Sequence, residues 1–205
     1  MTPLSPAARS GLVILAAGAS RRLGQPKQLL SVSGSPLLSR VIEAALAVPA
    51  VWPVVVVLGA HAEMIRPLAV RRPVLVAENP AWAEGMASSL RVGLETLLTF
   101  SSRLEAAIFA LCDQPAFSSA VIERLLAERA ATGASVVAAH YAGHPGAPAL
   151  IARSHFPVLR QLVGDEGARQ LFARLPPGAL APVEMPELAF DLDTPDDLQR
   201  LEPRT

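Results

Sequence analysis

Three basic residues follow a run of small residues early in the chain. Residues 16–20 carry no bulky side chain, so the backbone can approach a ligand closely and its N–H groups can surround an anion. Arg21, Arg22 and Lys27 add positive charge beside this segment. This combination suits a triphosphate, although an ordinary turn with solvated arginines would look similar. Neither G-x-G-x-x-G nor G-x-x-x-x-G-K-[ST] is present, so the two common phosphate loops are excluded.

A carboxylate that could hold a metal ion follows an apolar run in the middle of the chain. Asp113 stands just beyond residues 106–111, where it is either a turn residue or a ligand of Mg²⁺. Because Mg²⁺ in proteins usually takes one or two carboxylates together with substrate phosphates, a second acid should reach the same place.

The C-terminal segment 190–198 supplies candidates for that second acid. In an extended chain Asp191 and Asp193 point to one side and the intervening leucine to the other. Asp196 and Asp197 have a simpler explanation, because a final helix that begins at 194–195 would favour acids at its positive end. Asp193, with Asp191 as the alternative, is therefore the expected partner of Asp113.

Apolar runs alternate with helical patterns and would position these residues. Uninterrupted apolar runs predict buried strands at 11–16, 54–58, 74–77, 106–111 and 134–139. Apolar spacing and end signals predict helices at 36–47, 62–70, 86–100 and 118–131. Such alternation is typical of an α/β protein with a parallel sheet covered on both faces, and ligands bind beyond the C-terminal ends of its strands. The proline- and glycine-rich stretches 141–148 and 176–186 are predicted to be surface loops.

Length and composition fit one globular domain. We expect it to cover residues 11–205, after a flexible N-terminal segment 1–10 that has no signal-peptide core. The single cysteine excludes an internal disulfide and favours the cytoplasm. Equal numbers of basic and acidic residues, 18 each, argue against nucleic-acid binding. Pro49 and Pro53 interrupt the apolar stretch 44–60, so no membrane span is expected.

The three segments that could do chemistry share a resemblance to one enzyme family. The first of them has the pattern Leu15-Ala16-Ala17-Gly18-x-Ser20-x-Arg22-Leu23-Gly24-x-x-Lys27. This pattern resembles the opening signature of nucleotidyltransferases of the molybdenum-cofactor type, the MobA-like NTP transferase family. The likeness is greatest to the cytidylyltransferases of that family. Residues 111–115 (LCDQP) and 191–198 (DLDTPDDL) resemble the metal-binding segments of the same group. The resemblance implies a three-layer αβα, Rossmann-like (GT-A-like) nucleotidyltransferase fold with a mostly parallel sheet.

The resemblance also implies roles for individual residues. The backbone of Leu15, Ala16, Ala17 and Gly18 would hold the nucleotide. Catalysis would depend on Arg22 at the outer phosphates, Lys27 where charge develops, and Asp113. Asp113 and Asp193 would hold Mg²⁺, the expected cofactor.

Residues 79–90 (NPAWAEGMASSL) resemble the base-reading segment of the cytidylyl type. By that resemblance Gly85, Met86 and Ser89 contact the base and the nucleotide is CTP, although Ser88 and Ser89 would also suit the start of a helix.

The same resemblance makes a molybdopterin-type cofactor with a terminal phosphate the expected acceptor, and leaves open a molybdoenzyme as its recipient. Residues 164–169 resemble an acceptor-side segment, but Ala147 stands where the family often has histidine, which puts the acceptor's identity in doubt. Two rival interpretations are an NTP transferase with another small phosphorylated acceptor and a non-catalytic cofactor carrier. A dinucleotide-dependent oxidoreductase lacks its glycine fingerprint here.

Overall fold

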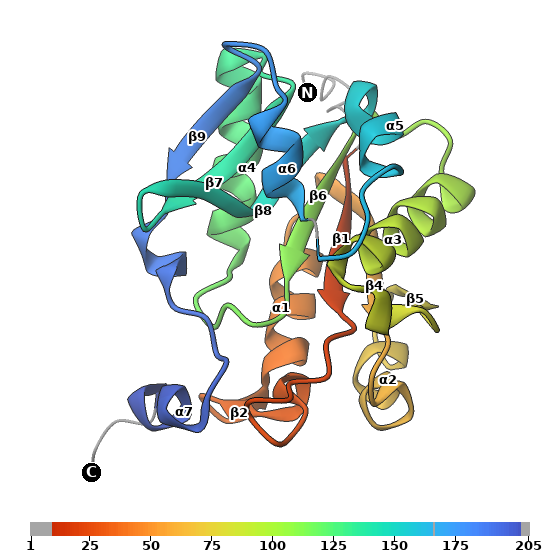
Figure 1. Cartoon of the computed structure of the whole chain (residues 1–205), viewed down its shortest axis with the longest axis vertical. Helices are drawn as coiled ribbons and strands as arrows, with labels where there is room; N and C mark the ends of the chain where they lie inside the picture. Colours follow the sequence, from red (N-terminus) through yellow and green to blue (C-terminus); the bar gives the residue numbers. More distant parts are fainter. Residues whose placement is uncertain (1–9, 166, 202–205) are drawn as a thin grey trace, which may run out of the picture.

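A seven-stranded sheet forms the centre of the protein (Figure 1). The computed structural model describes residues 10–165 and 167–201. The strand order is β5-β4-β1-β6-β8-β7-β9. The strands are β1 (Ser10–Ala16), β4 (Val51–Leu58), β5 (Leu75–Glu78), β6 (Ala106–Leu111), β7 (Val136–Tyr141), β8 (His144–Ala152) and β9 (Leu180–Glu184), and a separate small hairpin contains β2 (Ser31–Val32) and β3 (Ser35–Pro36).

The sheet is mostly parallel, as the apolar runs predict. β5, β4, β1 and β6 pair in parallel, and β8 alone runs against its two neighbours, β6 and β7. Side chains of β1 and β4 are buried on both faces of the sheet, which is why these strands read as continuous apolar runs. The C-terminal ends of β1 and β6 are neighbours, so the loops that follow them start side by side.

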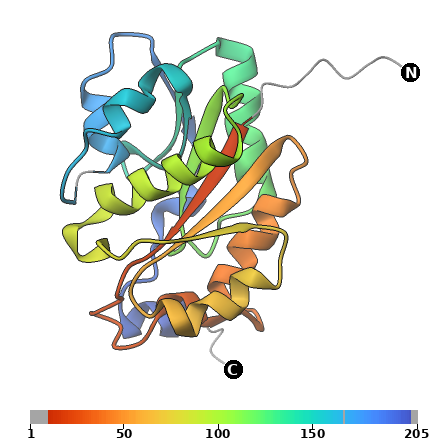
Figure 2. The same cartoon turned by 90° about the vertical axis from the view of Figure 1, so that its right-hand side faces the viewer.

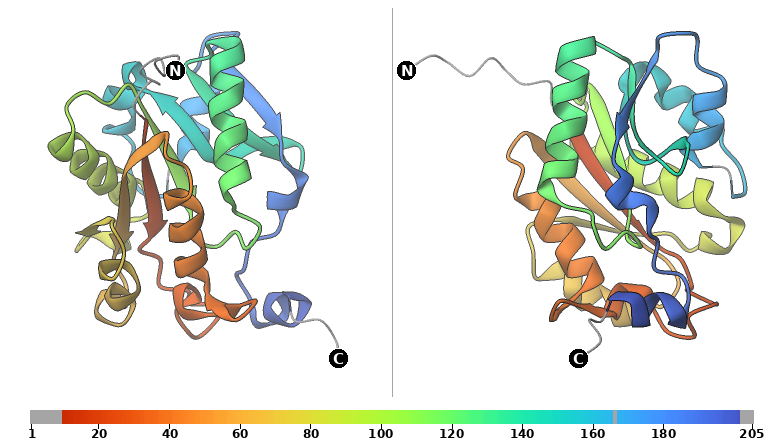
Figure 3. Two further views of the ribbon diagram at one scale, coloured as in Figure 1. Left: turned by 180° about the vertical axis from the view of Figure 1, so that it is seen from behind. Right: turned by 90° about the vertical axis from the view of Figure 1, so that its left-hand side faces the viewer.

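Helices cover both faces and complete the three layers. The helices are α1 (Leu37–Leu46), α2 (Ala62–Val70), α3 (Met86–Phe100), α4 (Ser119–Thr132), α5 (Phe156–Leu159), α6 (Ala168–Ala173) and α7 (Pro195–Leu201), with short 3₁₀ turns η1 (Lys27–Leu29), η2 (Trp82–Glu84), η3 (Arg153–His155) and η4 (Pro186–Ala189). One apolar core lies between the sheet and α1, α2 and α4, and a second lies under α3, α5 and α6 (Figures 1 and 3). The expected αβα fold is confirmed.

The prediction that the two proline- and glycine-rich stretches are surface loops is wrong. Within 141–148, β7 and β8 form a hairpin whose turn residues Ala142 and Gly143 have positive φ angles of 50° and 80°, as tight hairpin turns require. In the register of β7 against β8, Ala138 is paired with Ala149 but the next residue, Ala139, is paired with Gly146. Ala147 and Pro148 therefore form a bulge, where the proline does not have to donate a hydrogen bond to the neighbouring strand.

The second stretch, 176–186, contains β9, which pairs with β7 in parallel at the edge of the sheet. An edge position tolerates Pro182, because its missing N–H can face away from the neighbouring strand. At the other end of the chain, residues 1–9 of the expected flexible segment 1–10 lie outside the described residues, and Ser10 already belongs to β1.

Helix α3 crosses the parallel strands at very close range (Figure 2). A Cβ at Gly93 would collide with Cγ1 of Val13 and lie 3.0 Å from Cγ2 of Val57. Among the helices within the described ranges, none has the length and apolar character that crossing a membrane requires.

Gly93→Ala is therefore expected to lower the free energy of unfolding by about 1–3 kcal/mol, the usual cost of overpacking. A glycine-to-alanine change in an open helix would instead stabilise by roughly 0.5–1 kcal/mol. Urea unfolding measures the difference, with Thr99→Ala on the exposed side of α3 as the control. A stabilised Gly93→Ala variant would contradict the close packing.

Candidate active site

The small-residue loop after β1 lines a cavity of about 420 Å³ at the C-terminal ends of β1 and β6. The backbone N–H of Lys27 donates to Oγ of Ser20 at 3.1 Å, which closes the loop back on itself. The predicted nucleotide-binding residues Leu15, Ala16, Ala17 and Gly18 all line this cavity, together with Lys27 and Asp113.

Gln28 fixes the conformation of this loop, a role that the sequence did not reveal. Its side chain is buried, and Nε2 donates to the carbonyl oxygens of Ala16 at 2.8 Å and Gly18 at 3.1 Å. Holding two carbonyls on one side limits the directions in which the loop's N–H groups can point. A glutamine one residue after a lysine carries no pattern that would distinguish it from a surface residue.

Gln28→Leu should raise the KM for the nucleotide about tenfold, since it removes two hydrogen bonds worth about 1 kcal/mol each and leaves two carbonyls unsatisfied. Gln25→Leu makes the same chemical change at an exposed position of the same segment and should leave KM unchanged. Steady-state kinetics with varied nucleotide tests the pair. Equal effects of the two changes would remove Gln28 from this role.

The four charged residues to which the resemblance gives roles, Arg22, Lys27, Asp113 and Asp193, form one cluster. Nζ of Lys27 lies 3.0 Å from Oδ2 of Asp113 and 2.7 Å from Oδ1 of Asp193. Nη2 of Arg22 lies 2.7 Å from the other oxygen of Asp193, Oδ2. The Lys27 side chain is only 13% exposed, whereas that of Arg22 is 71% exposed.

The C-terminal segment reaches this cluster because a buried leucine fixes it there. Leu192 is fully buried against Leu23 and Leu30, and its N–H donates to the carbonyl of Asp113 at 2.8 Å. Asp193 then faces Lys27, whereas Asp191 lines a neighbouring cavity. The two acids that could have served as the second carboxylate are thus placed at different sites.

Asp197 stabilises the turn that carries Asp193. Its Oδ2 accepts hydrogen bonds from the backbone N–H groups of Asp193 and Thr194 at 3.1 and 2.8 Å, and from the Thr194 hydroxyl at 2.8 Å. These bonds, that of the Thr194 side chain first, lower the pKa of Asp197. The sequence predicted only a favourable charge at a helix start for this residue.

Lys27 and Asp193 stabilise each other's charged forms. Burial favours the neutral amine, but the charges and hydrogen bonds of Asp113 and Asp193 together outweigh burial and raise the pKa of Lys27 above its ordinary 10.5. Burial likewise opposes the charge of Asp193, yet Lys27 and Arg22 together lower the pKa of this carboxyl. The raised pKa of Lys27 and the lowered pKa of Asp193 both favour the charged forms of this pair.

The predicted base-reading residues Gly85, Met86 and Ser89 form part of the same cavity wall. Asn79 organises this segment: its Nδ2 donates to Oγ of Ser88 at 2.8 Å and of Ser89 at 2.9 Å. The hydroxyl of Ser89 is thus already oriented by a protein partner.

The segment that follows α5 packs against the same wall. The N–H of Ala87 donates to the carbonyl of Gly164 at 3.0 Å, and Asp165 lines the cavity beside Met86.

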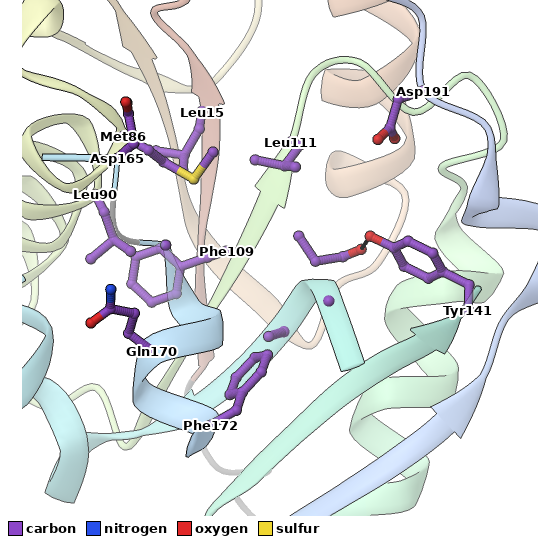
Figure 4. A pocket seen from close by; sticks show the side chains of 14 residues that line it. Leu15, Met86, Leu90, Phe109, Leu111, Tyr141, Asp165, Gln170, Phe172 and Asp191 are labelled. Atoms are coloured by element: carbon purple, nitrogen blue, oxygen red, sulfur yellow. Dashed lines mark hydrogen bonds between the residues drawn. The ribbon is translucent and has the colours of Figure 1, made fainter. Parts of the chain in front are cut away.

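A second, largely apolar cavity of about 580 Å³ adjoins the first and shares Leu15, Met86, Leu111 and Asp165 with it. Figure 4 shows the rings of Phe109 and Phe172 on one side and Tyr141 on the other, with Asp191 near the top. Ala147, in the β8 bulge, and Gly167 also line this cavity. The segments predicted to face the acceptor therefore meet here.

The chain is similar over almost its whole length to several known proteins. A protein from Paenarthrobacter nicotinovorans, named nicotine blue oxidoreductase, is 33% identical over 92% of this chain and 94% of its own. The molybdenum cofactor guanylyltransferase of Rhodobacter capsulatus is 31% identical over 94% of each chain. The crystal structure of Rv0371c from Mycobacterium tuberculosis H37Rv, a complex with manganese, superposes with a TM-score of 0.73 at 28% identity and covers 94% of this chain and 97% of that one.

The fold and the placement of its polar loops define the class, an α/β nucleotidyltransferase of the Rossmann-like GT-A type. Within that class, residues 12–179 match the MobA-like NTP transferase domain, and the chain belongs to this family.

Proposed function

We propose that the protein transfers CMP from CTP to the terminal phosphate of a molybdopterin-type acceptor and releases pyrophosphate. The observation that carries the proposal is the position of Lys27, Asp113 and Asp193: Lys27 and Asp113 line the small-residue cavity and Asp193 pairs with Lys27, and this cavity adjoins the apolar one. The first cavity suits a nucleoside triphosphate, and the second suits a flat ring system.

The carboxylates fit a divalent cation. Asp113 and Asp193 present hard oxygen donors from two segments, and Oδ1 of Asp113 is buried with no hydrogen-bond partner among the described residues. Mg²⁺ prefers such oxygens together with phosphate and water. A bound Mg²⁺ would supply positive charge at the α-phosphate. The manganese complex of the similar protein Rv0371c supports a divalent metal.

The reaction needs no nucleophile from the protein. An acceptor phosphate is largely a dianion at neutral pH, because its second pKa is about 6, and its oxygen can attack the α-phosphorus directly. A bond from that oxygen to the α-phosphorus forms as the bond to the β-phosphate oxygen breaks, and pyrophosphate leaves with the electron pair. Lys27 and Arg22 stabilise the charge that develops on the leaving group, and the loop after β1 holds the phosphates in line.

Two other activities compete with this one. The first is a redox reaction, which the name of the relative called nicotine blue oxidoreductase suggests. A carrier would bind the cofactor without turnover. Neither needs a lysine between two carboxylates beside a phosphate loop, so the transferase accounts for more of the site.

Product analysis separates these possibilities. The protein is incubated with each NTP, Mg²⁺ and purified molybdopterin, with and without bound molybdenum, and products are identified by mass spectrometry. The expected result is a cofactor heavier by one CMP and an equal amount of pyrophosphate. Tight cofactor binding without pyrophosphate release would favour the carrier. Pyrophosphate release only with sugar phosphates or other small phosphorylated acceptors would change the acceptor and keep the reaction.

CTP should be preferred over GTP and UTP. The base would lie against Gly85 and the first turn of α3, whose Met86 and Ser89 line the cavity, and a pyrimidine is the smaller base for such a wall. UTP has a base of the same size as CTP, so the site can reject it only if the different hydrogen-bonding edge of uracil leaves buried polar groups of the protein unpaired. UTP is therefore a more informative competitor than GTP. The kcat/KM values for the three nucleotides with one acceptor test this. A preference for GTP, the nucleotide implied by the name of the Rhodobacter relative, would overturn the base assignment alone.

A further inference from the structure

The ammonium group of Lys27 stands between two carboxylates that the proposed function assigns to a metal. It contacts one oxygen of each acid, at 3.0 Å for Asp113 and 2.7 Å for Asp193. These lengths are typical of charge-assisted hydrogen bonds. The side chains are 13%, 22% and 32% exposed for Lys27, Asp113 and Asp193, so the contacts are largely shielded from solvent.

The four carboxylate oxygens are mostly occupied by the protein's own cations. Lys27 binds Oδ2 of Asp113 and Oδ1 of Asp193, and Arg22 binds Oδ2 of Asp193. Only Oδ1 of Asp113 has no hydrogen-bond partner within the described part of the chain. Because Mg²⁺ binds oxygens at about 2.0–2.1 Å in an octahedron, a cation cannot bridge the two acids while the ammonium lies between them.

We propose that Lys27 is an internal counter-ion that blocks the metal site until the nucleotide binds, so that the triphosphate must draw Lys27 away before the two carboxylates can share a metal. This inference rests on the proposed function. Lys27 belongs to the same loop as the phosphate-binding backbone, through its N–H bond to Ser20, so its side chain has a short path to a bound triphosphate. Arg22, mostly exposed, can leave Asp193 in the same way.

This arrangement solves an electrostatic problem of two neighbouring acids. Two carboxylates that approach one another repel, and an ammonium between them removes the repulsion. A triphosphate carries more negative charge than either acid and would compete for the same ammonium. Nucleotide and metal should therefore bind with positive coupling, and by linkage each should raise the affinity of the other by the same factor.

A permanent structural ion pair makes the opposite prediction. If Lys27 only supports the two acids, removing it leaves them to repel and disorders the site, and metal binding weakens. If Lys27 competes with the metal, removing it exposes two carboxylates and metal binding strengthens. The sign of the change in metal affinity therefore decides between the two roles.

The experiment measures binding of Mn²⁺ by electron paramagnetic resonance in the absence of nucleotide. Lys27→Met and Lys27→Gln should bind Mn²⁺ about tenfold more tightly than the wild type, within the usual range of such couplings. Arg21→Met removes the same charge from the same loop, but within the described residues its guanidinium is paired with neither carboxylate, so its affinity should stay within about twofold of the wild type. Unchanged or weaker binding in both Lys27 variants, with unaltered thermal unfolding, would overturn the proposal.

A second measurement repeats the titration with a non-hydrolysable CTP analogue, using water-proton relaxation to detect protein-bound Mn²⁺. The tenfold gap between the wild type and Lys27→Met should close, because the triphosphate has already displaced Lys27 in the wild type. A gap of the same size with and without the analogue would contradict the displacement. Failure of the wild type to bind Mn²⁺ even with the analogue would instead contradict the metal site of the proposed function, and with it this inference.

Discussion

Asp113→Asn is expected to lower turnover by about 10²–10³ while the protein stays folded. The change keeps the size of the side chain but removes the negative charge that binds Lys27 and that the proposed metal requires. Asp113 stands at the end of β6, where its side chain contributes to the site and little to the two apolar cores. The kcat for pyrophosphate release at saturating Mg²⁺ measures the effect.

A matched control shows whether the loss is specific to this carboxylate. Asp196→Asn removes an exposed acid at the start of α7 and should leave kcat within about twofold of the wild type, as expected for a surface charge. Circular dichroism and thermal unfolding should show that both variants are folded. Near wild-type turnover of Asp113→Asn at saturating Mg²⁺ would exclude Asp113 from the mechanism.

Lys27→Ala should lower kcat by about 10²–10³ while it weakens nucleotide binding much less. The ammonium would gain its strongest partner as charge moves toward the departing pyrophosphate, so its contribution belongs to the transition state. Kinetics at varied CTP concentration separates kcat from KM. A raised KM with unchanged kcat would make Lys27 a ground-state phosphate contact.

Lys27→Ala also combines two opposite changes. The variant should lose turnover and yet bind Mn²⁺ more tightly without nucleotide, because the same ammonium both blocks the carboxylates and serves the reaction. A change that simply disordered the site would weaken both properties together. Measuring both on one preparation therefore distinguishes removal of a specific charge from general damage.

The parallel half of the sheet could be predicted from sequence because its signals are local. The predicted strand 11–16 differs from β1 by one residue, and the predicted helix 86–100 coincides with α3. β8 and β9 were missed because prolines normally end strands. Their tolerance of Pro148 and Pro182 depends on a bulge and a sheet edge, which are properties of neighbouring strands.

The site shows the same division between local and non-local information. Residue types and the family resemblance were enough to single out Lys27, Asp113 and Asp193, with Asp191 as the alternative. That Asp193 rather than Asp191 faces Lys27 depends on the burial of Leu192 and its backbone bond to Asp113, and so on how the chain returns to the β6 loop. The support that Gln28 gives to the loop depends on a turn that no periodicity describes.

β8 separates the parallel half of the sheet from its β7–β9 edge, and it alone runs against its neighbours. On one side, β5, β4, β1 and β6 run parallel and are followed by the small-residue loop and Asp113. On the other, the β7–β8 hairpin supplies Tyr141, Gly146 and Ala147 to the apolar cavity. Gln114 joins the two sides, because its Nε2 donates to the hydroxyl of Tyr141 at 3.1 Å and to the carbonyl of Ala147 at 3.2 Å, and Gln114 directly follows Asp113 in the chain. Under the proposed function, gene libraries that seek variants with other acceptors should therefore randomise the hairpin with Tyr141 held fixed, because its hydroxyl is a partner of the residue beside Asp113.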